Sequence, residues 1–172
     1  MLCKRLIACL DVRDGRVVKG TNFRALRDAG DPAELAARYD AEGIDEVVVL
    51  DVSATVENRR ALATTIQAVA SRLFIPLTVG GGVTTLDDAA ALFEAGADKV
   101  SINSAALRSP ELITAIAARY GSQAVIVAID AKREGEGDYR VFGRSGTDAS
   151  PREAVDWARE AADRGAGEIL AT

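Results

Sequence analysis

The sequence contains no histidine, and it has only two cysteines, four prolines and one tryptophan among 172 residues. The absence of histidine excludes Ser-His and Cys-His nucleophile pairs and most zinc sites. Acid–base chemistry must therefore come from carboxylate, lysine, tyrosine or cysteine side chains. Cys3 and Cys9 belong to one expected strand, where six residues span about 20 Å, too far for a disulfide. A reducing cytoplasm is the simplest expectation for such a chain.

Long apolar runs and basic stripes are also missing. No run approaches the roughly 20 residues that a membrane helix needs, and the first residues pass at once into a strand-like run, which leaves no room for a signal peptide. The formal net charge of −5 argues against a nucleic-acid partner. Hydrophobic residues make up 48% of the chain and charged residues 27%, as is typical of globular proteins. We expect a cytoplasmic protein with no membrane or nucleic-acid partner.

Short apolar runs alternate with longer amphipathic stretches. The runs are rich in Val, Ile and Leu without strict alternation, which is typical of strands buried on both faces. We predict strands at 6–10, 46–52, 75–79, 99–102, 124–129 and 168–171.

Helix boundaries between these runs are marked by capping residues and glycines. Helix starts are predicted at Asp31-Pro32, Ser109-Pro110 and Ser150-Pro151, and near a capping box at Thr85–Asp88. Helix ends are predicted at Gly43, Gly96 and Gly165. A repeated strand–helix–strand order indicates parallel strands, either in an open doubly wound sheet or in a barrel.

An internal repeat favours the barrel. The segment from Ile7 to Asp11 with Gly15–Gly20 reappears around Val127–Asp130 and Tyr139–Gly143, and the segment after Gly43 reappears after Gly165. The offset of roughly 120 residues indicates two copies of a half-barrel, together about the size of a (βα)8 TIM barrel.

We therefore expect an α/β fold, an incomplete (βα)8 barrel with about six parallel strands and five helices in one domain, residues 1–172. Residues 1–122 would form the first half-barrel and 123–172 the beginning of the second. The repeat predicts that the reading frame continues past Thr172. A small domain with a coincidental repeat is the alternative.

Functional residues in such a barrel lie where the strands end. Asp11 and Asp130 end equivalent strands of the repeat, so they are candidates for an acid–base pair; the alternative is that each caps the loop after its strand. Gly80-Gly81-Gly82 and Asn103-Ser104 follow adjacent strands and are candidates for binding phosphate. Lys19 lies in an expected long loop, 12–30, which could act as a lid over an anionic substrate.

Charged residues also occur where strands begin. Arg5 precedes the first strand, and Glu46, Lys99 and Glu168 each follow a helix-ending glycine by three residues. Such a layer facing inward requires paired charges and suggests a gate at the bottom of the barrel; exposed loop charges are the alternative.

The whole chain resembles the cyclase subunit of imidazole glycerol phosphate synthase, a lyase of histidine biosynthesis. The most specific matches run from Arg5 to Asp11 and on through Lys19-Gly20-Thr21-Asn22-Phe23, and then over 78–82, 97–103 and 121–133. The resemblance implies closure of an imidazole ring from ammonia and a bisphosphate, ribulosyl formimino aminoimidazole carboxamide ribonucleotide. The products would be imidazole glycerol phosphate and aminoimidazole carboxamide ribonucleotide.

The resemblance also implies roles for individual residues. Asp11 and Asp130 match the acid–base pair. Substrate or phosphate contacts are expected from Lys19, Asp51, Gly81, Gly82, Asn103, Ser104 and Thr172. Arg5, Glu46, Lys99 and Glu168 match a gate through which ammonia enters from a glutaminase subunit, as part of a heterodimer. No metal or organic cofactor is implied.

Two expectations qualify this assignment. Because the second phosphate site of the family lies beyond Thr172, we expect residues 1–172 alone to have little ring-closing activity. The alternatives are the related barrel isomerase of the preceding step, which would act without ammonia, and a non-catalytic fragment that binds phosphate or docks on a glutaminase.

Overall fold

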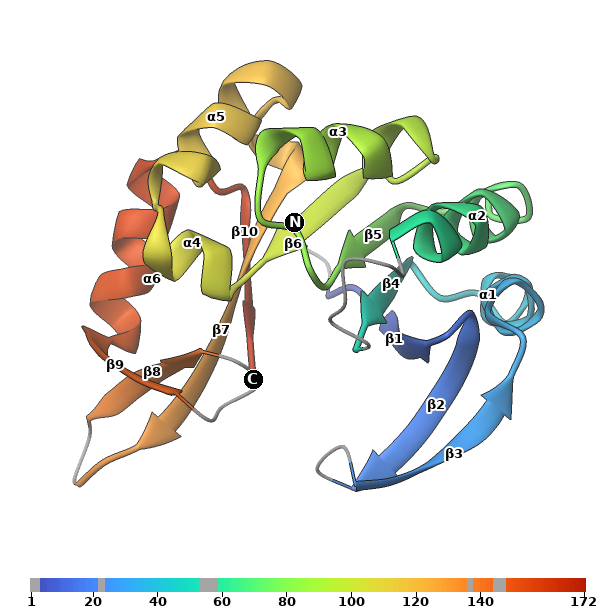
Figure 1. Ribbon diagram of the computed structural model, residues 1–172, viewed down its shortest axis with the longest axis horizontal. Coiled ribbons are helices and arrows are strands. Elements are labelled where there is room, and N and C mark those ends of the chain that lie inside the picture. The colour runs from blue at the N-terminus through green and yellow to red at the C-terminus, as the bar shows by residue number, and fades with distance from the viewer. Residues whose placement is uncertain (1–3, 22–23, 53–58, 136–137, 144–147) are drawn as a thin grey trace. The chain divides into compact units, whose positions relative to one another are not determined.

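The computed structural model describes residues 4–21, 24–52, 59–135, 138–143 and 148–172 (Figure 1). The chain forms two compact units. The first consists of Met1–Gly82 with Ala90–Val100, and the second of Val83–Ala89 with Ser101–Thr172.

Parallel strands form the centre of the first unit. Strands β1 (Ile7–Arg13), β4 (Glu46–Asp51) and β5 (Leu77–Gly80) pair in parallel, with Ile7 opposite Glu46 and Val47 opposite Leu77. Strand β6 (Lys99–Ile102) begins beside β5, where the Asp98 N–H donates to the Leu77 carbonyl at 2.8 Å. The strands predicted in this part of the chain are confirmed.

Helices α1 (Pro32–Ala41), α2 (Arg59–Ala70) and α3 (Leu86–Glu94) follow β3, β4 and β5 in the chain. Asp31 caps α1 by accepting from the Ala33 and Glu34 N–H groups at 2.9 and 3.0 Å, as predicted. The capping box before α3 is also confirmed: the Asp88 N–H donates to the Thr85 hydroxyl, and the Thr85 N–H donates to the Asp88 carboxylate.

An antiparallel ribbon follows β1, where the sequence predicted a long irregular loop at 12–30. That prediction is wrong. Asp14 and Gly15 have φ of 51° and 74°, so they form a tight turn that returns the chain as β2 (Arg16–Thr21), which pairs with β3 (Arg24–Gly30). Lys19 is exposed on β2, opposite Arg27 of β3.

The second unit is built around β7 (Val125–Arg133). This strand pairs in parallel with β10 (Glu168–Ala171) and antiparallel with β8 (Tyr139–Gly143), which pairs with β9 (Asp148–Glu153). Its helices are α4 (Ser104–Arg108), α5 (Glu111–Tyr120) and α6 (Ala154–Asp163), with a short 3-10 turn at Ser122–Ala124. The two strands predicted here, 124–129 and 168–171, are confirmed.

Two predicted helix starts differ from the structure. Ser150-Pro151 lies within β9, and α6 begins after Glu153, whose carboxylate accepts from the Val155 and Asp156 N–H groups at 2.8 and 3.0 Å. Glu153 is thus the N-cap of α6, where the sequence predicted Ser150. Helix α5 begins one residue later than predicted, at Glu111, with Pro110 in the N-cap position.

Each unit contains a parallel strand that continues into an antiparallel ribbon: β1 into β2 and β3, and β7 into β8 and β9. The structural pattern therefore repeats within the chain, as the sequence similarity does. The division into half-barrels at residue 122 stays a prediction.

The core of the first unit lies between its strands and helices. Val47 and Val49 of β4 and Ile66 of α2 have no exposed surface, and alternate residues of β4 on the opposite face, Glu46 and Val48, are also buried. Strand β4 is thus covered on both faces. Among the described helices, none combines the length and apolar character needed to span a membrane.

Candidate functional site

Asp11 lies near the carboxyl end of β1, beside Leu50 of β4. Leu10 and Val12 on either side of it are buried against the core, so the Asp11 side chain points to the opposite face of the sheet. Burial raises the pKa of the Asp11 carboxyl above its ordinary value of 3.8. Asp11 therefore retains a proton to a higher pH than a solvated aspartate does.

Asp51 ends β4 at the same edge of the sheet, and Gly81 packs directly against it. A Cβ on Gly81 would lie 2.2 Å from the Asp51 carbonyl oxygen and 2.8 Å from the Asp51 nitrogen, and Gly81 has φ of +97°. Only glycine permits this contact. Gly82, at φ +68°, has open space where its Cβ would be, so the two glycines differ in function: Gly81 fixes the path of the chain beside Asp51, while Gly82 borders open space.

Asp130 lies in β7 of the second unit and is held by two side chains. The Asn103 Nδ2 donates to one carboxylate oxygen at 3.2 Å, and the Thr172 hydroxyl donates to the other at 2.6 Å. Asn103 lies between β6 and α4, and Thr172 follows β10, so three segments converge on one carboxylate. The Asn103 Oδ1 is buried and accepts no hydrogen bond from the part of the chain that the structure describes.

Ser104 follows Asn103 and begins α4. A Cβ on Gly143, at the end of β8, would lie 3.5 Å from the Ser104 hydroxyl. The ribbon after β7 therefore passes close to Ser104.

The predicted site residues thus form two groups. Asp11, Asp51, Gly81 and Gly82 lie at the carboxyl ends of strands in the first unit, whereas Asn103, Ser104, Asp130 and Thr172 lie together in the second. Lys19 is in the first unit, exposed on the ribbon. Within the described ranges, no group of three or more His, Cys, Asp or Glu side chains is arranged to hold a metal ion.

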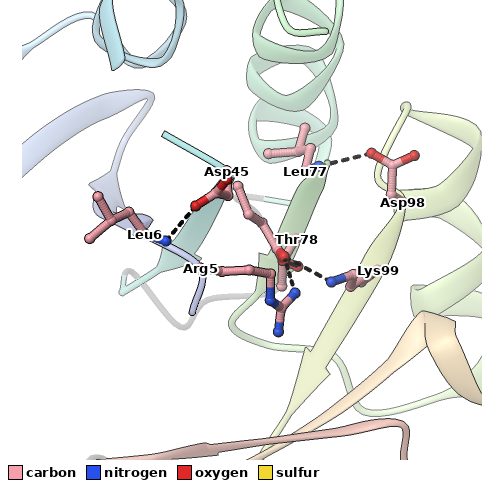
Figure 2. A network of polar contacts seen from close by, with 8 residues as sticks. Arg5, Leu6, Asp45, Leu77, Thr78, Asp98 and Lys99 are labelled. Carbon is pink, nitrogen blue, oxygen red and sulfur yellow. Dashed lines mark hydrogen bonds and ion pairs between the residues drawn. The ribbon is translucent and has the colours of Figure 1, made fainter. Parts of the chain in front are cut away.

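A buried ion-pair cluster lies at the other end of the strands of the first unit (Figure 2). Its centre is Glu46, the first residue of β4, which is 1% exposed. The Arg5 Nη1 and the Lys99 Nζ each lie 2.8 Å from the Glu46 Oε2, and the Thr78 hydroxyl donates to the Oε1 at 2.5 Å. Both oxygens of the carboxylate are therefore paired, which offsets the cost of burying its charge.

Three of the charged residues predicted at the strand starts, Arg5, Glu46 and Lys99, pair with one another within the first unit. Glu168 begins β10 in the second unit, where its side chain is half-buried. Thr78 was missed by the sequence analysis, although a polar residue within the apolar run 75–79 was a signal for it. It is fully buried.

The cluster and Asp11 lie at opposite ends of the same strands. Glu46 and Asp51 are the first and last residues of β4, and five residues of strand span about 16 Å. In the first unit, the ion pairs of Glu46 therefore lie where the strands begin, and the half-buried carboxyl of Asp11 lies where they end.

Comparisons with known proteins show the family of this chain. Residues 5–172 match the family described as "Histidine biosynthesis protein". Two relatives bear the name "Imidazole glycerol phosphate synthase subunit HisF". The one from Acidobacterium capsulatum is 62% identical over 172 residues, and the one from Myxococcus xanthus (strain DK1622) is 55% identical. The alignment covers all of this chain and 68% of each relative.

The family match spans nearly the whole chain and agrees with the (βα)8-type pattern of strands, and both relatives are more than half identical to it. The chain therefore belongs to the histidine biosynthesis protein family, among the HisF cyclase subunits of imidazole glycerol phosphate synthase.

Proposed function

We propose that Asp11 and Asp130 are the acid–base pair of the cyclase reaction. In that reaction ammonia and ribulosyl formimino aminoimidazole carboxamide ribonucleotide yield imidazole glycerol phosphate, aminoimidazole carboxamide ribonucleotide and water. Adding ammonia, losing water and closing the ring all move protons to and from nitrogen and oxygen atoms. Two carboxyl groups in different environments suit this chemistry, because one can donate a proton where the other accepts one.

The observation that carries the proposal is the contrast between the two carboxyl groups. Burial raises the pKa of Asp11, whereas Asp130 accepts hydrogen bonds on both oxygens from Asn103 and Thr172. Hydrogen bonds to both oxygens fix the orientation of a carboxylate, which a positioned base requires. Asn103 and Thr172 are accordingly assigned to holding Asp130 in addition to contacting the substrate.

Phosphate binding is assigned to Gly82, Asn103 and Ser104, with Lys19 as a further cation for the substrate. The support at Gly82 is the open space beside its backbone, which lets an anion approach the N–H groups. The support at Asn103 is its Nδ2, which carries two hydrogens and donates one of them to Asp130, so that the other can be donated to a phosphate oxygen. Asp51 is assigned to the same end of the strands.

Ammonia delivery is assigned to the end of the strands that holds Arg5, Glu46 and Lys99, with Glu168 as a fourth member. The supporting observation is that these charges are paired with one another through Glu46, so that a passage there could open by rearranging an ion pair. We assign the docking of a glutaminase subunit to this end, and the "subunit" in the relatives' name supports an assembly of this kind.

The test is the turnover of the assembled enzyme with ammonium salt after Asp11→Asn or Asp130→Asn, since we expect residues 1–172 alone to turn over little substrate. Each substitution should lower kcat by roughly a hundredfold to ten-thousandfold, because an amide cannot transfer the proton. KM for the ribonucleotide should change much less. Asp163→Asn, an exposed aspartate at the end of α6, is the control and should keep kcat.

Different results would identify other functions. Isomerisation of a formimino substrate without ammonia would point to the isomerase reaction. Substrate binding without turnover, unaltered by Asp130→Asn, would point to a non-catalytic binding role and overturn the proposal.

A further inference from the structure

The three side chains that donate hydrogen bonds to the Glu46 carboxylate come from three separate segments of the chain. Arg5 lies two residues before β1, Thr78 is the second residue of β5 and Lys99 is the first residue of β6. Because Glu46 is buried, the loss of any one of these donors weakens the pairing that offsets the cost of burying its charge. Contacts that hold the starts of these strands in place would therefore keep the three donors beside Glu46.

Two aspartates form identical hydrogen-bonded brackets at this end of the sheet (Figure 2). The Leu6 N–H donates to the Asp45 carboxylate at 2.7 Å, and the Asp45 N–H donates to the Leu6 carbonyl at 2.9 Å. The Leu77 N–H donates to the Asp98 carboxylate at 2.8 Å, and the Asp98 N–H returns to the Leu77 carbonyl at 2.8 Å. Each bracket joins two neighbouring strands at the point where they begin.

Each bracket also joins two members of the cluster through one peptide unit on each side. Asp45 adjoins Glu46, and its partner Leu6 adjoins Arg5. Asp98 adjoins Lys99, and its partner Leu77 adjoins Thr78. The same arrangement occurs twice around one carboxylate, and it connects all four residues of the cluster.

The paired strands alone do not hold Arg5. The β1–β4 ladder begins with Ile7 opposite Glu46, so Leu6 and Arg5 lie outside it. Beyond the ladder, Asp45 provides the bracket on the backbone next to Arg5. The side chain of Arg5 is 45% exposed, so burial alone does not fix its position beside Glu46.

We propose that Asp45 and Asp98 are positioning residues of the ion-pair cluster: Asp45 holds Arg5 against Glu46, and Asp98 holds Thr78 and Lys99 against it. The link to ammonia delivery rests on the proposed function, whereas the positioning itself does not.

Double-mutant cycles in the protein test the positioning. Asp45→Ala should lower the urea midpoint of unfolding, and about half or less of that shift should remain when Arg5→Ala is already present, because residues that act through one another are not additive. Asp98→Ala should behave in the same way with Thr78→Val. Both aspartates are exposed, so neither substitution opens the core.

Asp40 provides a matched control. Its carboxylate accepts from the Phe74 N–H at 3.0 Å, also just before β5, but it adjoins no residue of the cluster. The shift caused by Asp40→Ala should be the same with and without Arg5→Ala. Asp45→Asn and Asp98→Asn keep a side-chain oxygen as acceptor, so they should restore most of the midpoint.

Three results would overturn the proposal: equal shifts for Asp45→Ala in both backgrounds, equal shifts for Asp98→Ala with and without Thr78→Val, or asparagine variants as unstable as the alanine variants. A separate assay compares turnover driven by glutamine, with the glutaminase present, against turnover driven by ammonium salt. If Arg5→Ala does not lower this ratio, the assignment of a gate fails, and the cycles still decide whether the aspartates position the cluster.

Discussion

Asp11 and Cys9 lie two residues apart in β1 and therefore point to the same face of the strand. Burial raises the pKa of the Asp11 carboxyl. Burial also raises the pKa of the Cys9 thiol to about 11, with the negative charge of Asp11 as the second cause. On this face of β1, both side chains therefore keep their protons to a higher pH than they would in water.

Replacing Asp11 with asparagine should stabilise the fold at neutral pH. The folded protein holds the Asp11 proton to a higher pH than the unfolded chain, so stability falls as the pH rises from 3.8 through the folded pKa and stays lower above it. Asparagine carries no charge to desolvate. Urea midpoints of wild type and Asp11→Asn should therefore differ most at neutral pH and converge toward pH 3.8. A variant that is less stable than wild type at neutral pH would contradict this.

Cys9 should react slowly with iodoacetamide at neutral pH, even though part of its side chain is exposed. Relative to the ordinary value of 9.0, a pKa of about 11 lowers the thiolate fraction roughly a hundredfold. With Cys3→Ser to leave one thiol, Asp11→Asn should accelerate alkylation because it removes a negative charge. Asp14→Asn, at a highly exposed aspartate, should not. Alkylation of Cys9 at the rate of free cysteine would contradict the prediction.

At the scale of elements, the turn after β5 gives two adjacent glycines different requirements. Gly81→Ala should cost about 3 kcal/mol, because the new Cβ would overlap the Asp51 backbone at a position that also has positive φ. Gly82→Ala should cost about 1 kcal/mol, since it meets open space and pays only for its positive φ. Urea unfolding of both variants measures the difference. Equal losses would mean that contact with Asp51 does not distinguish the two positions.

The elements that the sequence predicted correctly are those whose own residues show a clear pattern, such as a continuous apolar run. All six predicted strands are confirmed, and four of them, β4, β5, β6 and β7, are largely buried, which requires mostly apolar runs. The ribbons were missed because their strands mix polar and apolar residues and lack a continuous apolar run: β9 reads DASPRE. A signal for the first ribbon was present, since Asp14-Gly15 is a preferred two-residue hairpin turn. The proline at position 151 misled the prediction of α6, because it also fits an edge strand.

At the scale of the whole molecule, sequence reasoning found residues at the ends of strands but not the contacts between them. The charges of Arg5, Glu46 and Lys99 indicated a cluster, and the structure confirms that these three pair. Thr78 and the brackets of Asp45 and Asp98 were missed, because they depend on which strands are neighbours and in which register. Thr172 was predicted as a substrate contact, but its hydrogen bond to Asp130 was not predicted, because that bond depends on β10 lying beside β7.

The separation of about 16 Å between the two ends of β4 predicts that substitutions at each end alter different steps. Lys99→Met removes a cation from Glu46 but keeps an unbranched side chain, so it should lower turnover driven by glutamine more than turnover driven by ammonium salt. Asp11→Asn should lower both to the same extent, because the acid–base step is common to both sources of ammonia. The measurement is the ratio of the two kcat values in the assembled enzyme. A ratio lowered by Asp11→Asn but not by Lys99→Met would mean that ammonia does not enter past Glu46.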